Sequence, residues 1–418
     1  MKTFREGAVL SRLEAEANFG VPLPIGKLGI LDVVEDGYRI RFVGWWTTQS
    51  GELCCSLPKV FPDSPSHDEF NLLVRTIRKE QRQHQAQAQS DESTTIRQAD
   101  NLRDLFEAIL SHTEQFGWHT EEHWIESEEL AHANWERTAD ECVGSYLGLD
   151  FVFPATIGTC LHSAPSRLAP LQALALQNLE ARARPVLEDL KGRYESIISE
   201  VNALAEIASE FASPRVLIDE LLESNRDHDR ALASLLDRWL RGCRTKLASG
   251  FSGTSSFAHT WERAVRACIL GSPDILDISH SEFASQPIAR DKNGNIVSRS
   301  SSQRPDLWCL AGGLSYLIDA KWYDEGSLPP TPDIIKQLMY ELSAHHKISG
   351  NVFIVPTKAQ TSRHLTSIRL EYADEFDERF PLIRVIELPT VEVLASYINC
   401  DRSNLGSRII ELMSPVAV

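Results

Sequence analysis

The sequence lacks the features that define several large classes of protein. No apolar run approaches the roughly 20 residues that a membrane-spanning helix needs, and no apolar segment of a secretory signal follows the first residues. The eight cysteines form no C-x-x-C pair and no Cys/His cluster at zinc spacing. The nucleotide-binding pattern G-x-x-x-x-G-K-[ST] is also absent. We therefore expect a cytoplasmic protein with reduced thiols and no membrane partner.

The charge balance is acidic. The 418 residues include 59 Asp and Glu against 42 Lys and Arg, a formal net charge of −17. Hydrophobic residues make up 42%, which is typical of a globular chain long enough for two or three domains. Proteins that bind nucleic acid usually carry a basic surface. A DNA-binding role for this chain therefore requires a local basic cleft or a partner that holds the DNA.

Residues 1–93 are predicted to form a β-rich N-terminal domain that binds DNA or a partner. Two β-branched and aromatic runs, 38–46 and 53–61, flank a polar turn and indicate a hairpin or a small sheet. Trp45 and Trp46 lie in the first run, where packing is favoured over a DNA-stacking surface. A helix follows from Asp68 to about Lys79, and the Gln-rich tract 81–89 is interpreted as a linker or a frayed helix end.

Residues 94–248 are predicted to form a helical domain. Apolar residues at three- and four-residue steps between Leu187 and Leu204 indicate one long amphipathic helix. A second helical stretch covers about 214–246, with a break near Asn225. A bundle core is favoured over an intermolecular coiled coil. The segment 119–123 matches the zinc-peptidase pattern H-x-x-E-H, but a polar helix start is the favoured interpretation.

Residues 249–418 are predicted to form an α/β domain, a mixed sheet flanked by helices. It follows the small residues 249–256, which we interpret as a flexible boundary. The expected elements, in chain order, are a helix at 257–270, strands at 306–310 and 314–321, a helix at about 332–346 and a strand at 351–355.

Two carboxylates and one lysine are expected to converge in this domain. A two-residue turn at Gly312-Gly313 pairs Leu310 with Ser315 and, further out, Asp306 with Asp319. Opposed residues project from the same face of a sheet. Lys321 lies two residues beyond Asp319 and therefore projects from that face as well.

These residue types suit metal-assisted hydrolysis of a phosphodiester. Mg²⁺ binds one or two carboxylates, waters and substrate phosphate, so we expect Asp306 and Asp319 to be metal ligands, with Mn²⁺ as an alternative ion. Lys321 would position the attacking water or stabilise developing charge. Glu262 is a further candidate ligand on the preceding helix, and Gln337 a further catalytic candidate on the following one.

The motifs, taken in order, resemble the PD-(D/E)xK nuclease superfamily. They are similar to those of LlaJI-type restriction endonucleases and McrC-like nuclease subunits. The matching segments are Phe257…Trp261-Glu262, Arg304-Pro305-Asp306, Ile318-Asp319-Ala320-Lys321 and Lys336-Gln337…Tyr340, with short N-terminal matches at Val43-Gly44, Leu57-Pro58-Lys59 and 134–138.

The resemblance implies a Mg²⁺-dependent DNA endonuclease, the cutting subunit of a restriction or antiviral defence system. In that family a separate AAA+ motor hydrolyses nucleotide, so the expected partners are DNA and an AAA+ NTPase. Assembly of the chain into a homo-oligomer is left as an open alternative. Two alternatives remain: a non-catalytic McrC-like adaptor that stimulates a partner ATPase, and a DNA-repair nuclease.

Overall fold

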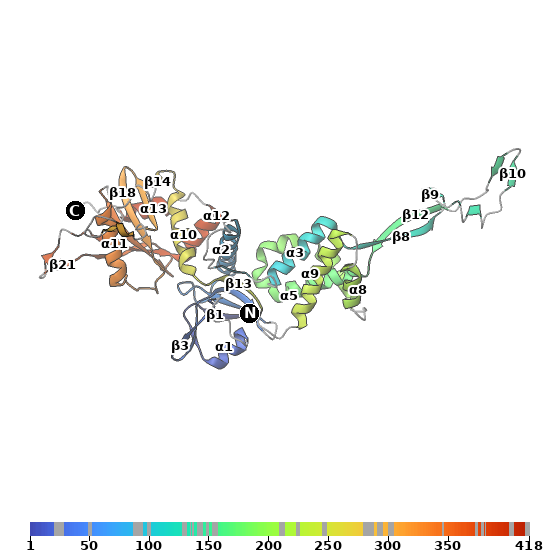
Figure 1. The fold of residues 1–418 in the computed structure, drawn as a ribbon, viewed down its shortest axis with the longest axis horizontal. Coiled ribbons are helices and arrows are strands. Elements are labelled where there is room, and N and C mark those ends of the chain that lie inside the picture. The colour runs from blue at the N-terminus through green and yellow to red at the C-terminus, as the bar shows by residue number, and fades with distance from the viewer. Residues whose placement is uncertain are drawn as a thin grey trace. The chain divides into compact units, whose positions relative to one another are not determined.

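The computed structural model of the chain separates into two units (Figure 1). Unit 1 joins Met1–Gln98 to Lys246–Val418, and unit 2 is Ala99–Thr245. The division into three domains after residues 93 and 248 stays a prediction. The structure describes residues 1–20, 29–48, 52–86, 95–97, 102–127, 132–133, 135, 138–139, 145–147, 150–152, 158–208, 214–222, 226–244, 249–278, 288–290, 296–299, 305–344, 347–372, 375–377, 380, 382–400 and 405–413.

The N-terminal part of unit 1 is built from two small sheets. The first has the strand order β1-β6-β5-β13-β7 and the second the order β2-β4-β3. Helix α1 accompanies them and begins at a capping box, in which Ser11 and Glu14 bond each other's backbone amides. The elements are β1 (Lys2–Arg5), β2 (Val9–Leu10), α1 (Arg12–Phe19), β3 (Leu31–Val34), β4 (Gly37–Ile40), β5 (Val43–Thr47), β6 (Leu53–Leu57), β7 (Thr95–Arg97) and β13 (Ser249–Thr254).

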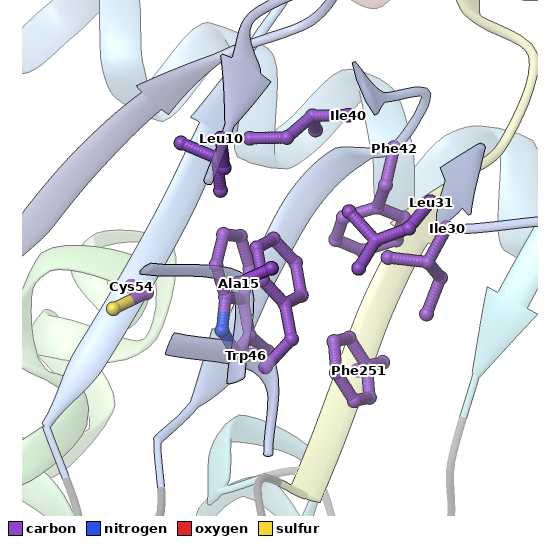
Figure 2. Close-up of a cluster of buried hydrophobic side chains, with 10 residues drawn as sticks. Leu10, Ala15, Ile30, Leu31, Ile40, Phe42, Trp46, Cys54 and Phe251 are labelled. Atoms are coloured by element: carbon purple, nitrogen blue, oxygen red, sulfur yellow. The ribbon is translucent and has the colours of Figure 1, made fainter. Parts of the chain in front are cut away.

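Aromatic rings form the core of this part, as Figure 2 shows. The predicted pairing of the two strands in the first hairpin is confirmed, with Trp46 opposite Cys54; its turn lies outside the described residues. Trp46 is fully buried, stacks on Phe19 at a centroid distance of 4.5 Å, and its indole N–H donates to Asn18 O. Trp45 is buried too. Neither ring is therefore available for stacking on a base.

The segment interpreted as a flexible boundary is instead strand β13, in the middle of the N-terminal sheet. It pairs with β5 on one side and β7 on the other, and Phe251 enters the aromatic core (Figure 2). Its glycines serve close packing. Gly253 lies opposite Gly44, and a Cβ on Gly253 would lie 2.2 Å from Val43 O and 2.6 Å from the Phe42 ring. The pair of glycines lets the two backbones and the ring approach.

Helix α2 (His67–Ala86) corrects a second interpretation, because it continues through the first part of the Gln-rich tract. Gln81 is buried and donates to Ser252 Oγ at 3.0 Å. Glu80 is also buried, where it accepts hydrogen bonds from Arg263 and the Tyr397 hydroxyl. Tertiary contacts with later parts of the chain therefore sustain a helix that the local sequence does not indicate.

The C-terminal part of unit 1 contains a mixed sheet with the strand order β14-β17-β18-β19-β23-β20. Strands β18, β19 and β23 run parallel and the other pairings are antiparallel. The elements are α10 (Phe257–Leu270), β14 (Ile275–Asp277), β15 (Ile288–Arg290), β16 (Ile296–Arg299), β17 (Leu307–Ala311), β18 (Leu314–Ala320), α11 (Thr331–Ser343), β19 (Gly350–Thr357), β20 (Arg363–Ile368), β21 (Glu371–Tyr372), β22 (Glu375–Phe376), β23 (Ile383–Pro389), α12 (Thr390–Asn399) and α13 (Leu405–Met413).

Helix α11 packs on the face of this sheet from which Asp319 projects. Leu338 joins a buried cluster with Phe353, the residue opposite Asp319 in the sheet. Tyr340 packs with Trp308 and Leu317. The predicted elements of this region are confirmed within two or three residues, and α11 begins one residue before the expected Pro332. The α/β class of this domain is therefore confirmed.

Unit 2 is helical for most of its described length, but it also contains strands that we did not predict. The predicted break near Asn225 is confirmed, whereas the long helix between Leu187 and Leu204 is divided into short helical segments. The helices are α3 (Leu102–Phe116), α5 (Leu168–Ala183), η1 (Arg184–Val186), η2 (Glu188–Leu190), α6 (Lys191–Glu195), α7 (Ile198–Ala208), α8 (Pro214–Leu222) and α9 (Asp227–Arg244). The strands are β8 (Thr120–Ser127), β9 (His132–Ala133), β10 (Ser145–Leu147), β11 (Asp150–Val152) and β12 (Gly158–Pro165).

The H-x-x-E-H segment lies on strand β8, so the expected polar helix start is wrong. His119 precedes the strand and its Nδ1 lies 2.6 Å from Ser166 Oγ, which directly follows β12 at the same end of the β8–β12 pair. Its Nε2 lies 3.4 Å from Asp229 Oδ1. The strand does not give the two histidines the spacing on one helix face that a zinc peptidase requires.

The described helices and cysteines bear on the expectations about the membrane and the thiols. Within the described residues, no helix is both long and apolar enough to cross a bilayer. Cys54, Cys55, Cys268 and Cys309 are free and buried, and Cys400 is free and exposed. Residues 345–346, at the end of the helix expected at about 332–346, lie outside the described residues.

The glycine pair generates a stability prediction. Gly253→Ala should lower the free energy of unfolding by about 1–3 kcal/mol, the usual cost of adding a methyl group to a close-packed interior. Chemical denaturation of the full chain measures the change. Gly192→Ala is the control, because a Cβ there meets nothing within 4 Å and alanine favours a helix. Equal stability of the Gly253→Ala and wild-type proteins would contradict the packing role of this glycine pair.

Candidate active site

The hairpin of β17 and β18 has the predicted register. Leu310 lies opposite Ser315, and Leu307 lies opposite Ile318. The turn glycines Gly312 and Gly313 have φ angles of 56° and 78°, the left-handed conformation that a two-residue hairpin turn requires. Asp306, just before Leu307, therefore lies beside Asp319 at the open end of the hairpin.

The side chain of Asp319 is almost completely buried. The residue is 1% exposed, and among the described residues its carboxylate oxygens have no hydrogen-bond partner besides Lys321 and Asp306. Lys321 Nζ lies 2.8 Å from Asp319 Oδ2; we take this contact as an ion pair, without the direction of a regular hydrogen bond. A buried carboxylate usually has more hydrogen-bond donors around it, so these two oxygens have capacity left for a cation.

Asp306 is held in place from two sides. Its Oδ2 accepts a hydrogen bond from the Ala320 amide at 2.9 Å, and its backbone carbonyl accepts one from Arg266 at 2.7 Å. Arg266 also pairs with Asp277 on β14. Burial raises the pKa of Asp306 to about 8, with further contributions from the charge of Asp319, a hydrogen bond with it, and the charge of Glu262. Without a cation, the two neighbouring carboxylates therefore bind a proton more tightly than separate aspartates would.

Two more charged groups complete the cluster. Burial lowers the pKa of Lys321, but Asp319, Asp306 and Glu262 outweigh it and raise that pKa above its ordinary value. Lys321 therefore stays cationic. Burial raises the pKa of Glu262, and Asp319 adds to that rise while His259 and Lys321 oppose it. Helix α10 thus brings Glu262 into the electrostatic neighbourhood of the hairpin, as expected.

Gln337 lies on helix α11, where it is fully buried against the beginning of strand β19. Its amide nitrogen donates to Asn351 Oδ1 at 2.6 Å, and its own oxygen has no hydrogen-bond partner. Asn351 in turn donates to Glu341 and lies opposite Leu317, two residues from Asp319. The described contacts of Gln337 are therefore with the sheet. Its catalytic role stays a prediction.

Lys336 and Tyr340 also approach the cluster, and our sequence reasoning gave neither a role. Lys336 Nζ lies 5.4 Å from the centroid of the Tyr340 ring. Burial raises the pKa of Tyr340, and the negative charge of Asp319 adds to that rise. Burial lowers the pKa of Lys336, but Tyr340 and Asp319 outweigh it and raise that pKa above its ordinary value. Their spacing of four residues places them on one face of α11. That spacing was the signal available in the sequence.

The donor set fits a hard divalent cation held by few protein ligands. Among the described residues, no group of three or more His, Cys, Asp and Glu side chains has the arrangement of a metal site. Mg²⁺ does not require one, since it keeps several waters and binds through one or two carboxylates. The buried oxygens of Asp319 and the neighbouring carboxylate of Asp306 are suitable ligands, and Glu262 is a third candidate.

A mixed sheet with Pro-Asp before one strand and Asp-x-Lys at the end of the next is the arrangement of PD-(D/E)xK nucleases. The chain belongs to the LlaJI restriction endonuclease family, whose sequence model matches residues 123–391. This match covers more than half of the chain and includes the hairpin, α10 and α11. The chain is therefore a member of a nuclease family.

One solved structure is similar to this chain at low identity. A chain from the "refined half-complex from tetradecameric assembly of Thermococcus gammatolerans McrB AAA+ hexamers with bound McrC" is similar at 13% identity, with a TM-score of 0.39 over 95% of this chain and 98% of that one. No curated protein matches in sequence. A likeness at that TM-score carries no argument about this chain.

The raised pKa of Asp306 generates a prediction about pH. An acid whose pKa rises from about 3.8 when unfolded to about 8 when folded stabilises the fold below the lower value, and that stabilisation is lost as pH rises through the upper one. Asp306→Asn removes this titration. In the metal-free proteins, the melting temperature of the variant relative to wild type should therefore increase from about pH 5 to about pH 8.

Thermal melts of both proteins in EDTA measure the difference. Added Mg²⁺ should raise the melting temperature of the wild type, more at the higher pH because binding displaces the proton. It should not raise that of Asp306→Asn. Parallel pH profiles for the two proteins would contradict the titration of Asp306 in this range.

Proposed function

We propose that this chain is a metal-dependent DNA endonuclease, the cutting subunit of a restriction or antiviral defence system. One observation carries the proposal: the buried carboxylate of Asp319 lies beside Asp306 and Lys321, and among the described residues its oxygens have no other hydrogen-bond partner. Membership of the LlaJI restriction endonuclease family supports the reaction class. The expected ion is Mg²⁺, with Mn²⁺ as the alternative.

In this proposal Asp306 and Asp319 hold the metal, and Glu262 supports it directly or through water. The bound ion would activate water and offset charge on the phosphate. Binding requires Asp306 to lose its proton, because a metal ligand must be deprotonated. The removal of repulsion between the two carboxylates then favours the bound state.

Lys321 is the proposed catalytic cation. Its ammonium group is surrounded by carboxylates that keep it charged, and its contact with Asp319 fixes it beside the proposed metal ligands. From there it can orient the attacking water and stabilise the negative charge that develops on the phosphate. Lys336 is exposed at the edge of the same cluster and is placed to meet the DNA backbone.

We further propose that cleavage depends on a separate AAA+ motor. The chain has no nucleotide-binding loop of its own and carries a net charge of −17. An acidic surface repels DNA except at a local basic or metal-loaded site. A partner that holds DNA and hydrolyses nucleotide would supply both missing functions.

A non-catalytic adaptor is the less favoured alternative. Burying carboxylates side by side costs free energy, and a scaffold that only stimulates a partner gains nothing from that cost. A metal site gains a ligand set from it. The same argument does not separate a restriction nuclease from a repair nuclease, and family membership favours the former.

The first test of the proposal is removal of a ligand. Asp319→Ala should lower the rate of plasmid cleavage by at least about 100-fold, more than the loss of a residue that only supports a ligand. The fold should persist, because the change removes a buried charge. Cleavage is measured with the chain and its candidate partner in Mg²⁺. Glu371→Ala, which changes an exposed acid in the same unit, is the control and should cut like wild type. Unchanged cutting by a folded Asp319→Ala protein would exclude the metal site.

The second test concerns the partner. At about 0.15 M salt, where the Debye length is about 8 Å, the isolated chain should bind DNA weakly and cut little. Addition of the nucleotide-hydrolysing partner with ATP or GTP should restore cleavage. Efficient, site-specific cutting by the chain alone would contradict the dependence on a partner and leave the nuclease assignment standing.

A further inference from the structure

Trp322 links two parts of the candidate site, because it directly follows Lys321 in the chain and its ring packs against helix α10. It follows Lys321, whose backbone amide donates to Ile354 O at 2.8 Å. Its side chain is 8% exposed. The indole ring packs against Phe257 and Trp261 of α10, at centroid distances of 4.9 and 5.5 Å. Because α10 also carries Glu262, the position of this one indole is linked to both the lysine and the acidic helix.

The only hydrogen bond recorded for the Trp322 indole in the described structure is to the N-terminal sheet. Its Nε1 donates to Glu6 Oε2 at 2.9 Å. The same oxygen accepts the Lys59 amide at 3.2 Å. Glu6 directly follows strand β1, and its own amide donates to Leu57 O at 2.8 Å. The acceptor is therefore attached to the backbone at the end of the β1–β6 pair.

The segment that carries Lys59 is fixed as well. Arg5 donates to the carbonyls of Pro58, Phe61 and Pro62 at 3.2, 2.8 and 3.2 Å. These bonds hold the 58–62 turn over the end of β1. A second link between the same segments, Lys59 with Asp324 at 3.2 Å, is largely exposed on the aspartate side. Solvent screens that pair, so the bond from Trp322 to Glu6 is the stronger link.

Burial of the Glu6 carboxylate has an unfavourable free energy that a packing role alone does not explain. Burial raises its pKa, and the bonds from Trp322 and Lys59 oppose that rise. An uncharged residue would pack at the same place without the desolvation cost. The carboxylate instead gives a directed bond to one indole N–H, and a hydrogen bond to a charged acceptor is stronger than a neutral one.

We propose that Glu6 is a positioning residue for Lys321: it fixes Trp322, and through Trp322 the lysine and α10. This inference rests on the proposed role of Lys321 in cleavage. It makes the N-terminal sheet a part of the cutting machinery, since the geometry of the site depends on a side chain outside the nuclease fold. A displacement of about 1 Å at a catalytic group is enough to lower a rate by about 100-fold.

The experiment compares Glu6→Ala, Glu6→Gln and Trp322→Phe in the full chain with its partner and Mg²⁺. Glu6→Ala should lower kcat for cleavage by about 10- to 100-fold and leave KM for DNA nearly unchanged, because Glu6 acts on the chemical step. Glu6→Gln keeps an oxygen acceptor and should restore most of the rate. Trp322→Phe keeps the ring packing but not the N–H, and should match Glu6→Ala. The double variant should be no slower than either single one.

Asp324→Asn is the matched control, because it breaks the exposed link between the same two segments; its kcat should stay within about twofold of wild type. A second readout does not need cleavage. Lysines methylated with ¹³C give one NMR signal each, and the Lys321 signal is identified by its loss in Lys321→Ala. It should move in Glu6→Ala and return in Glu6→Gln.

Each result decides the question. Wild-type rate in a folded Glu6→Ala protein, or an unmoved Lys321 signal, overturns the positioning role. Absence of cleavage by the wild type with its partner would overturn the proposed function, and the NMR signal would still decide whether Glu6 positions Lys321. If Glu6→Ala does not fold, Glu6→Gln and Trp322→Phe carry the comparison: a slow Trp322→Phe beside an active Glu6→Gln supports the role, and two wild-type rates overturn it.

Discussion

The burial of Asp319 beside a second carboxylate is the constraint on which the candidate site depends. One lysine, Lys321, contacts Asp319 directly, while Asp306 and Glu262 add negative charge around it. Without a cation the cluster lowers its charge by holding a proton on Asp306. A protein that only needed a stable hairpin end would not retain this arrangement, because like charges in a buried place oppose folding. Binding of a metal ion would offset this unfavourable free energy.

Long-range contacts keep this cluster in place. The hairpin itself is local, but the Ala320 amide, Arg266 on α10 and the pairing of β18 with β19 fix its open end. Helix α10 in turn begins just after β13, a strand of the N-terminal sheet. The chain passes through that sheet immediately before it enters the nuclease fold. The two parts of unit 1 are therefore joined by backbone pairing as well as by side chains.

The difference between what could and could not be predicted follows from the range of the interactions. The register of β17 and β18 was predictable because a Gly-Gly turn determines it within a few residues. Strand β13 was not, because a Gly- and Ser-rich segment favours a loop until Gly44 and Phe42, far upstream, are placed against Gly253.

Helix ends show the same limit. The sequence predicts the start of α2, whose first turn contains Asp68 and Glu69, but not its continuation, which depends on burial of Glu80 against Arg263 and Tyr397. For the site, local spacing was enough to select Asp306, Asp319 and Lys321. It could not identify Glu6, because no local pattern links this residue to an indole 316 residues later in the chain.

The acidic charge of the protein makes DNA binding depend on the few cationic groups at the site. A chain with a net charge of −17 gains little affinity from phosphate contacts over its general surface, since that affinity comes from cationic side chains. The cationic groups described near the cluster are Lys321, Lys336 and Arg266. Lys321 is already paired with Asp319, and Arg266 with Asp277. A bound divalent ion would reverse this balance, because it neutralises the carboxylates and leaves the lysines to face the phosphate. DNA would then be held at the site only when the metal is present, so binding and cutting would share one requirement.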